Sequence, residues 1–189
     1  MTIALLYLVL ITQAVAQTAF HSPRPRVLIH AKAQISEKHS LTMHVVPTTN
    51  LLADSASPIV HLELGRTNWK HVDVAPAIGW AYHINQPIAA VRIHTKGKNN
   101  WSWTDLRVLP LAGPWLVASM VEYQGSWIAI GIEVEGSGSL TDPSTSNIGA
   151  GPNILFGGKP LRLDLSIQGR HIPYAGFKPE LSTRVHMIF

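Results

Sequence analysis

The segment from Pro160 to Arg170 alternates apolar and polar residues without a break. Its apolar row is Leu161, Leu163, Leu165 and Ile167. Successive side chains of a strand point to opposite faces, so this spacing predicts a β-strand with one apolar and one polar face. Such regular alternation over so many residues is uncommon in soluble strands, which mostly have about five or six residues.

The same alternation recurs along most of the chain, and helical spacing is almost absent. Counted back from the C-terminus, it predicts eight strands at roughly 69–83, 86–95, 101–111, 114–123, 126–136, 149–157, 160–170 and 179–189. Earlier alternating pieces near 26–35, 41–47 and 58–66 add two or more strands. Most connections are short and rich in Gly, Asn and Pro, which favours antiparallel pairing of consecutive strands because a parallel crossover needs about a dozen residues or more.

These features predict an all-β fold, an antiparallel up-and-down transmembrane β-barrel of 8 to 12 strands. A strand that crosses a bilayer needs about 9 to 11 residues, and the predicted segments have that length. Bacterial single-chain barrels have an even number of strands, which favours 8 or 10. The alternative is a soluble, secreted or periplasmic β-sandwich or lipocalin-like module, in which the polar rows face solvent.

The N-terminus has the order of a secretory signal peptide. Residues 1–16 contain no charged side chain, hold the apolar run Ile3–Ile11, and end in Ala14-Val15-Ala16. The apolar run is too short for a membrane-spanning helix, which needs about 18 residues or more, so we expect cleavage after Ala16. Residues 17–189 then form one β-barrel domain, with 17–57 partly irregular.

If the apolar rows face lipid, the opposite rows line the lumen with charges of both signs. The expected polar network is His61, Glu63, His71, Asp73, Arg92, His94, Asp105, Arg107, Glu133, Glu135, Arg162, Asp164, Arg170, Arg184 and His186. Aromatic residues gather near strand ends, as in the belts that membrane barrels place at the lipid–water interfaces. The expected belt residues are Trp80, Tyr82, Trp115, Tyr123 and Trp127.

The chain ends on Phe189, preceded on the same face by Met187 and Val185. This ending resembles the closing strand of bacterial outer-membrane β-barrel proteins. The resemblance covers the last ten residues and the general alternation; Met187 stands where that class more often has an aromatic residue. It implies a porin-like protein of a Gram-negative cell envelope, in contact with outer-membrane lipid, whose Phe189 is the signal for the barrel-assembly machinery.

No reaction or small-molecule ligand is indicated. The chain has no cysteine, and its ten histidines include no H-x-H or H-x-x-x-H pair, so we expect no metal site and no cofactor. The positive charges that give a net charge of +4 are scattered, which argues against nucleic-acid binding. No nucleophile motif is present. We therefore expect a structural, surface-interaction or narrow transport role in the outer membrane, and an envelope hydrolase with a lumen histidine or acid remains a further alternative.

Overall fold

The computed structural model describes residues 24–47, 58–82, 84–110, 114–124, 127–139 and 142–189, with the backbone alone for 114–124 and 143. The described residues contain eleven strands and a short 3-10 helix, Pro143–Thr145. The strands are β1 Arg24–Gln34, β2 His39–Val46, β3 Ile59–Arg66, β4 Val72–Ala81, β5 Gln86–Lys96, β6 Asn100–Val108, β7 Pro114–Gln124, β8 Ile128–Ser139, β9 Asn147–Gly158, β10 Leu161–Ile172 and β11 Gly176–Ile188. The predicted signal peptide, residues 1–16, lies outside the described residues.

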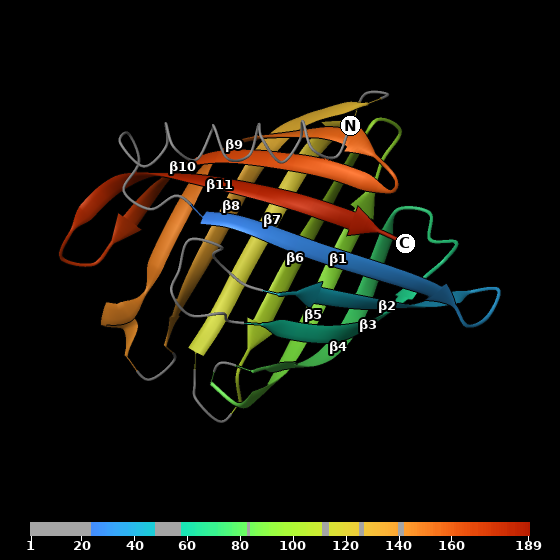
Figure 1. Cartoon of the computed structure of the whole chain (residues 1–189), viewed down its shortest axis with the longest axis horizontal. Helices are drawn as coiled ribbons and strands as arrows, with labels where there is room; N and C mark the ends of the chain where they lie inside the picture. The colour runs from blue at the N-terminus through green and yellow to red at the C-terminus, as the bar shows by residue number, and fades with distance from the viewer. Residues whose placement is uncertain (1–23, 48–57, 83, 111–113, 125–126, 140–141) are drawn as a thin grey trace.

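All eleven described strands belong to one sheet that curls into a closed barrel, as Figure 1 shows. Each strand pairs antiparallel with its neighbours in sequence, and β1 pairs with β11 in parallel. In an up-and-down barrel with an odd number of strands, the first and last strands run in the same direction, so this closure has to be parallel. The eleven strands lie within the expected 8 to 12, but the barrel does not have the even number that we favoured. All three early alternating pieces form strands, and parallel pairing removes the need for an even number.

The closing seam joins the two ends of the chain. Arg24 to His30 of β1 lie beside Ser182 to Ile188 of β11. Phe189 extends the seam, because its backbone N–H donates to the His30 carbonyl at 2.9 Å and its carbonyl accepts from the Lys32 N–H at 3.2 Å. The last residue of the chain therefore takes part in closing the barrel.

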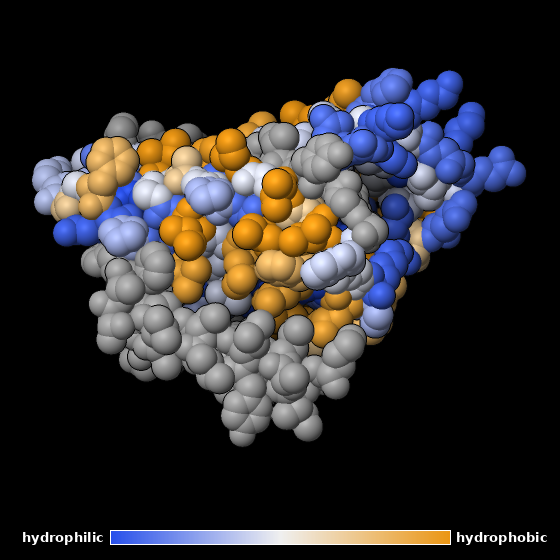
Figure 2. All heavy atoms as spheres, turned by 90° about the horizontal axis from the view of Figure 1, so that it is seen from above, coloured by the Kyte–Doolittle hydropathy of each residue, from blue (hydrophilic) through white to orange (hydrophobic). Residues whose placement is uncertain are grey.

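Large apolar side chains cover the outer face of the barrel. Among the most exposed are Ile78 at 70 %, Ile132 at 62 % and Val74 at 59 %. On β10, Ile167 is half exposed, Leu161 and Leu165 are partly exposed, and Leu163 is buried. Figure 2 shows hydrophobic residues gathered around the middle of the molecule. No helix among the described residues is long and apolar enough to cross a membrane.

The aromatic residues expected in belts are placed only in part. Trp80, Tyr82 and Trp127 are exposed on the barrel, at 38 %, 58 % and 64 %. The side chains of Trp115 and Tyr123 lie outside the described residues.

One end of the barrel is strongly basic. It carries the short connections β1–β2, β3–β4, β5–β6 and β9–β10 together with the C-terminus. The exposed cations there are Lys32, Lys38, Arg66, Lys70, Lys96, Lys98 and Lys159. Among the described residues of these connections, Glu37 is the one exposed carboxylate. Figure 2 shows hydrophilic side chains projecting beyond the hydrophobic band where the connections lie.

Candidate functional site

The inner face of the barrel is lined by polar and charged residues, many of them almost completely buried. Glu133 and Asp164 have no exposed surface, and His61 is 2 % exposed. Small residues make room for them: Ala75, Ala77, Gly79 and Ala81 of β4 share the inner face. On β9, a Cβ on Gly149 would lie 3.2 Å from Cζ of Arg170, so this glycine leaves space for the arginine side chain.

A cavity of about 430 Å³ lies inside the barrel. Its polar lining is Arg24, Arg26, His30, His44, His61, Arg92, His94, Asp105, Arg107, Glu135, Arg162, Asp164, Arg184 and His186. Its apolar lining is Leu28, Val45, Val46, Ile59, Trp101, Trp103, Leu155 and Ile188. This cavity is the candidate functional site because it combines charged groups with a substantial apolar wall, as small-molecule sites do.

The first group of ion pairs lies near the β1–β11 seam. Arg184 contacts Glu133, and its Nε lies 3.1 Å from Oδ2 of Asp164. Two arginines of β1 share one carboxylate: Nη1 of Arg24 lies 2.7 Å from Oε1 of Glu135, and Nη2 of Arg26 lies 3.2 Å from the same oxygen. These pairs connect β1, β8, β10 and β11 through the lumen. They are desolvated, so each charge depends on its partner for stability.

A second group lies on β3, β5 and β6. Arg92 places Nη1 3.0 Å from Oε2 of Glu63 and Nη2 3.0 Å from Oδ2 of Asp105. Arg107 approaches the same Asp105 oxygen at 2.6 Å, and Nε2 of His94 lies 3.1 Å from Oε1 of Glu63. The guanidinium of Arg92 also lies 5.8 Å from the ring centre of Trp103, within the range of a cation–π contact.

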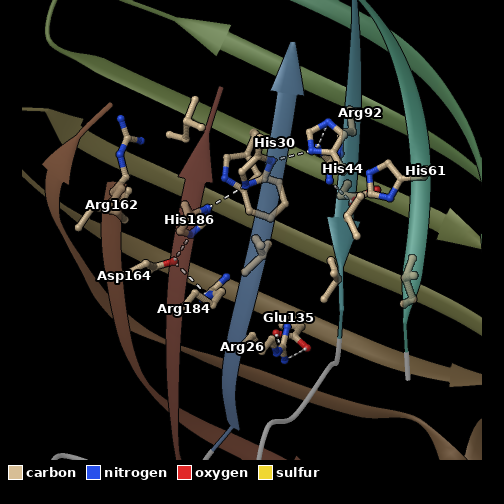
Figure 3. A pocket seen from close by; sticks show the side chains of 18 of the residues that line it. Arg26, His30, His44, His61, Arg92, Glu135, Arg162, Asp164, Arg184 and His186 are labelled. Atoms are coloured by element: carbon tan, nitrogen blue, oxygen red, sulfur yellow. Dashed lines mark hydrogen bonds and ion pairs between the residues drawn. The ribbon is translucent and has the colours of Figure 1, made fainter. Parts of the chain in front are cut away.

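Histidines from four strands form a row along the cavity wall (Figure 3). His30 places Nε2 3.0 Å from Nδ1 of His186 and Nδ1 2.8 Å from Nδ1 of His44. Nε2 of His44 lies 3.2 Å from Oε2 of Glu63, and His61 stacks on His44 with ring centres 4.6 Å apart. At the other end, Nε2 of His186 lies 3.6 Å from Oδ2 of Asp164.

One set of tautomers is compatible with the hydrogen bonds along this row. In this set His44 donates from Nε2 to the carboxylate of Glu63, which only accepts. A neutral His44 then accepts at Nδ1 from His30, and a neutral His30 accepts at Nε2 from His186. The remaining nitrogen, Nε2 of His186, faces Asp164 without a hydrogen bond among the described residues.

Two cavity-lining groups have no polar partner within the described part of the chain. Neither ring nitrogen of His61 makes a hydrogen bond, although the residue is buried. Arg162 makes no ion pair there, whereas the other arginines of the lining each contact a carboxylate. A polar ligand gains the most binding free energy from cavity groups that have no hydrogen-bond partner of their own.

The structure places nearly all of the residues expected in a lumen network on the inner face. His61, Glu63, Asp73, Asp105, Arg107, Glu133, Glu135, Asp164, Arg170 and Arg184 are buried, and Arg92, His94, Arg162 and His186 are partly exposed toward the cavity. His71 is different: it precedes β4, is exposed, and takes no part in the network. Its placement with the inner row was wrong because β4 begins at Val72, so the alternation does not extend to residue 71.

Several residues of the site were absent from the expected network. They are Arg24, Arg26, His30, His44, Glu180, Trp101 and Trp103. The alternation of Arg24, Arg26 and His30 with Pro25, Val27 and Ile29 was a usable signal for the first strand. Glu180 accepts a hydrogen bond from Arg24, and its Oε2 lies 2.8 Å from Nε of Arg170. Nothing in the sequence indicated this residue except its place in the last strand.

No group of three or more potential metal ligands converges on one point among the described residues. The histidine row is extended rather than convergent, and each ring faces a different neighbour. No known protein-family model matches the chain, and no curated protein or solved structure does either.

Proposed function

We propose that this chain is an integral outer-membrane β-barrel protein, exported with its N-terminal signal peptide and inserted after cleavage at Ala16. The observation that carries the proposal is the polarity of the barrel: charged side chains are buried inside it while Ile78, Ile132 and Val74 are exposed outside. In water this arrangement exposes a large apolar surface and buries charges at a cost. In a bilayer the outer face contacts hydrocarbon, and the closed sheet satisfies the backbone hydrogen bonds.

Strand length supports the same environment. All described strands except β2 and β3 have nine or more residues, and β11 has 13. Tilted strands of about 9 to 11 residues span the hydrocarbon layer. The basic end carries short turns, which in bacterial barrels face the periplasm, so we place the C-terminus on that side.

A narrow lumen role fits this barrel better than a wide pore. Ion pairs such as Arg184 with Asp164 and Arg92 with Glu63 bridge inner-face positions, and the remaining cavity is about 430 Å³. Porins with open channels have many more strands and a wide aqueous interior. We therefore assign the barrel to membrane anchoring and to holding or passing a small molecule.

Heat-modifiable migration in a detergent gel tests the proposal. A closed membrane barrel stays folded in cold detergent and migrates differently after boiling, so two bands that depend on boiling are expected. Cell fractionation provides the second measurement: the full chain should remain in the membrane pellet after an alkaline carbonate wash, and its mature form should begin at Gln17. A monomer in the periplasmic fraction that is soluble without detergent would refute the proposal and favour the lipocalin-like alternative.

A further inference from the structure

The charge balance of the cavity leaves one arginine without a counterion. Its lining contains six arginines, Arg24, Arg26, Arg92, Arg107, Arg162 and Arg184, against three carboxylates, Asp105, Glu135 and Asp164. Carboxylates outside the lining balance part of this excess, since Glu63 contacts Arg92 and Glu133 contacts Arg184. Arg162 alone among the six makes no ion pair with a described residue.

Arg162 lies beside a polar and an apolar side chain, which suit the acid group and the apolar body of an organic acid. It is the register partner of His186 on β11, and His186 is in turn the partner of Leu28 on β1. These three side chains from adjacent strands all line the cavity. Figure 3 shows Arg162 beside, rather than within, the contacts that join Asp164, His186 and Arg184. A free guanidinium thus stands close to an imidazole and an apolar side chain.

The approach to Arg162 is electropositive. Arg162 follows the β9–β10 turn, where Lys159 is exposed at the basic end of the barrel. That end exposes seven cations against the single exposed carboxylate of Glu37 among the described residues of its connections. A surface of one sign raises the local concentration of ligands of the opposite sign. Anions are therefore concentrated near the end of the barrel at which Arg162 lies.

We propose that the barrel cavity is a binding site for a small organic anion, whose acid group pairs with Arg162 and whose apolar body lies against Leu28, Trp103 and Leu155. A guanidinium holds a carboxylate or phosphate through two parallel hydrogen bonds, and no ion pair or hydrogen bond to a described residue occupies the donors of Arg162. The cavity volume of about 430 Å³ is within the usual range for small-molecule sites. The ring nitrogens of His61, which make no hydrogen bond to any described residue, offer a further polar contact.

The inference goes beyond membrane insertion, and it is tested with the full chain held in an amphipathic polymer. Two probes share a two-ring body: 2-naphthoate carries an acid group, and 2-naphthalenemethanol is neutral. In calorimetric titrations, 2-naphthoate should bind at one site, and the neutral alcohol at least about tenfold more weakly, because a buried charge-assisted hydrogen bond is lost. Titration into the polymer alone gives the background.

Arg162→Gln should weaken 2-naphthoate binding by about tenfold or more and leave the alcohol unchanged. Arg162→Lys should recover part of the affinity, since it keeps the charge but not the paired geometry. The matched control is Lys159→Gln, which removes one positive charge from the nearby turn outside the cavity lining and should change affinity less than about twofold because exposed charges are screened.

The proposal is overturned if the wild-type chain does not bind 2-naphthoate, if it binds the alcohol equally well, or if Arg162→Gln binds like the wild type. An equal loss in Lys159→Gln also overturns it, because the effect would then be general attraction rather than a site. Heat-modifiable migration of each variant confirms that the barrel is folded. It also reports separately on the membrane proposal, so the two can fail independently.

Discussion

Arg184 of β11 and Asp164 of β10 are register partners, and the arginine Nε lies 3.1 Å from the aspartate Oδ2 inside the barrel. Asp164 is completely buried and Arg184 is 4 % exposed. The same arginine contacts the buried Glu133 of β8. One guanidinium thus neutralises two carboxylates that have no access to bulk water, and it joins the closing strand to β8, three strands away around the barrel.

Replacing Arg184 with Met should therefore be strongly destabilising. It leaves Glu133 and Asp164 buried without a counterion, and breaking a buried pair from one side costs about 3–5 kcal/mol. Urea unfolding of the chain folded into phospholipid vesicles, followed by tryptophan fluorescence, measures the loss. The control is Arg66→Met: the side chain of Arg66 is 65 % exposed, and its buried partner Asp73 keeps the hydrogen bond from the backbone N–H of residue 66, so a change below about 1 kcal/mol is expected. Equal losses of stability in the two variants would contradict the argument that burial makes the Arg184 ion pairs important.

A charge on the outer face should be costly only if that face contacts lipid. Ile132→Arg introduces a cation at a position that is 62 % exposed within β8. In a bilayer such a change costs about 2–4 kcal/mol near the midplane, whereas at an exposed site in water it changes stability by about 0.5 kcal/mol or less. The free energy of unfolding in vesicles distinguishes these cases. Ile35→Arg, in the exposed β1–β2 connection, should be almost neutral in both.

Gly151 of β9 should not tolerate a side chain. A Cβ there would lie 1.9 Å from the carbonyl oxygen of Ile167 on the neighbouring strand, so the backbone would have to move. Gly151→Ala should lower stability by about 1–3 kcal/mol, the usual cost of overpacking. Gly169→Ala is the matched control on β10, because no atom lies within 4 Å of its added Cβ. Thermal unfolding midpoints of the two variants in detergent give the comparison, and similar midpoints would disagree with the packing at Gly151.

His30 should depend on its hydrogen-bonding capacity rather than on its ring. It connects His186 at 3.0 Å with His44 at 2.8 Å. His30→Leu leaves both neighbours without this partner and should cost about 1–3 kcal/mol. His30→Gln keeps one donor and one acceptor, so it should lose clearly less. Urea unfolding in vesicles measures both variants, and an equally large loss in the two would mean that the histidine row does not contribute through hydrogen bonds.

The positions of the strands followed from local pattern. The alternation near 160–170 and 179–189 predicted β10 and β11, because a strand with two different faces has a period of two whatever it packs against. The early pieces near 26–35, 41–47 and 58–66 had the same signal and form β1 to β3. The exact count was harder, since it depends on how many of these early pieces join the barrel.

The sequence predicted which residues of the candidate site share one face of a strand, but not which of them form ion pairs with one another. That Arg162 and Asp164 share one face with Arg170 follows from their spacing. Arg184 contacts two carboxylates, whereas Arg162 makes no ion pair with a described residue. This difference depends on the distances between side chains of different strands. No local rule gives those distances, because they are set by how the sheet closes.

By itself, therefore, the sequence determined the strands, their two faces and their antiparallel order along the chain. Only the tertiary structure decided that β1 pairs with β11 in parallel, that the charged face is the inner one, and that His30, His44 and His186 meet in one row. The physical reason is range: side-chain alternation is a property of each strand, whereas closure and lumen contacts join residues of different strands, some of them separated by most of the chain.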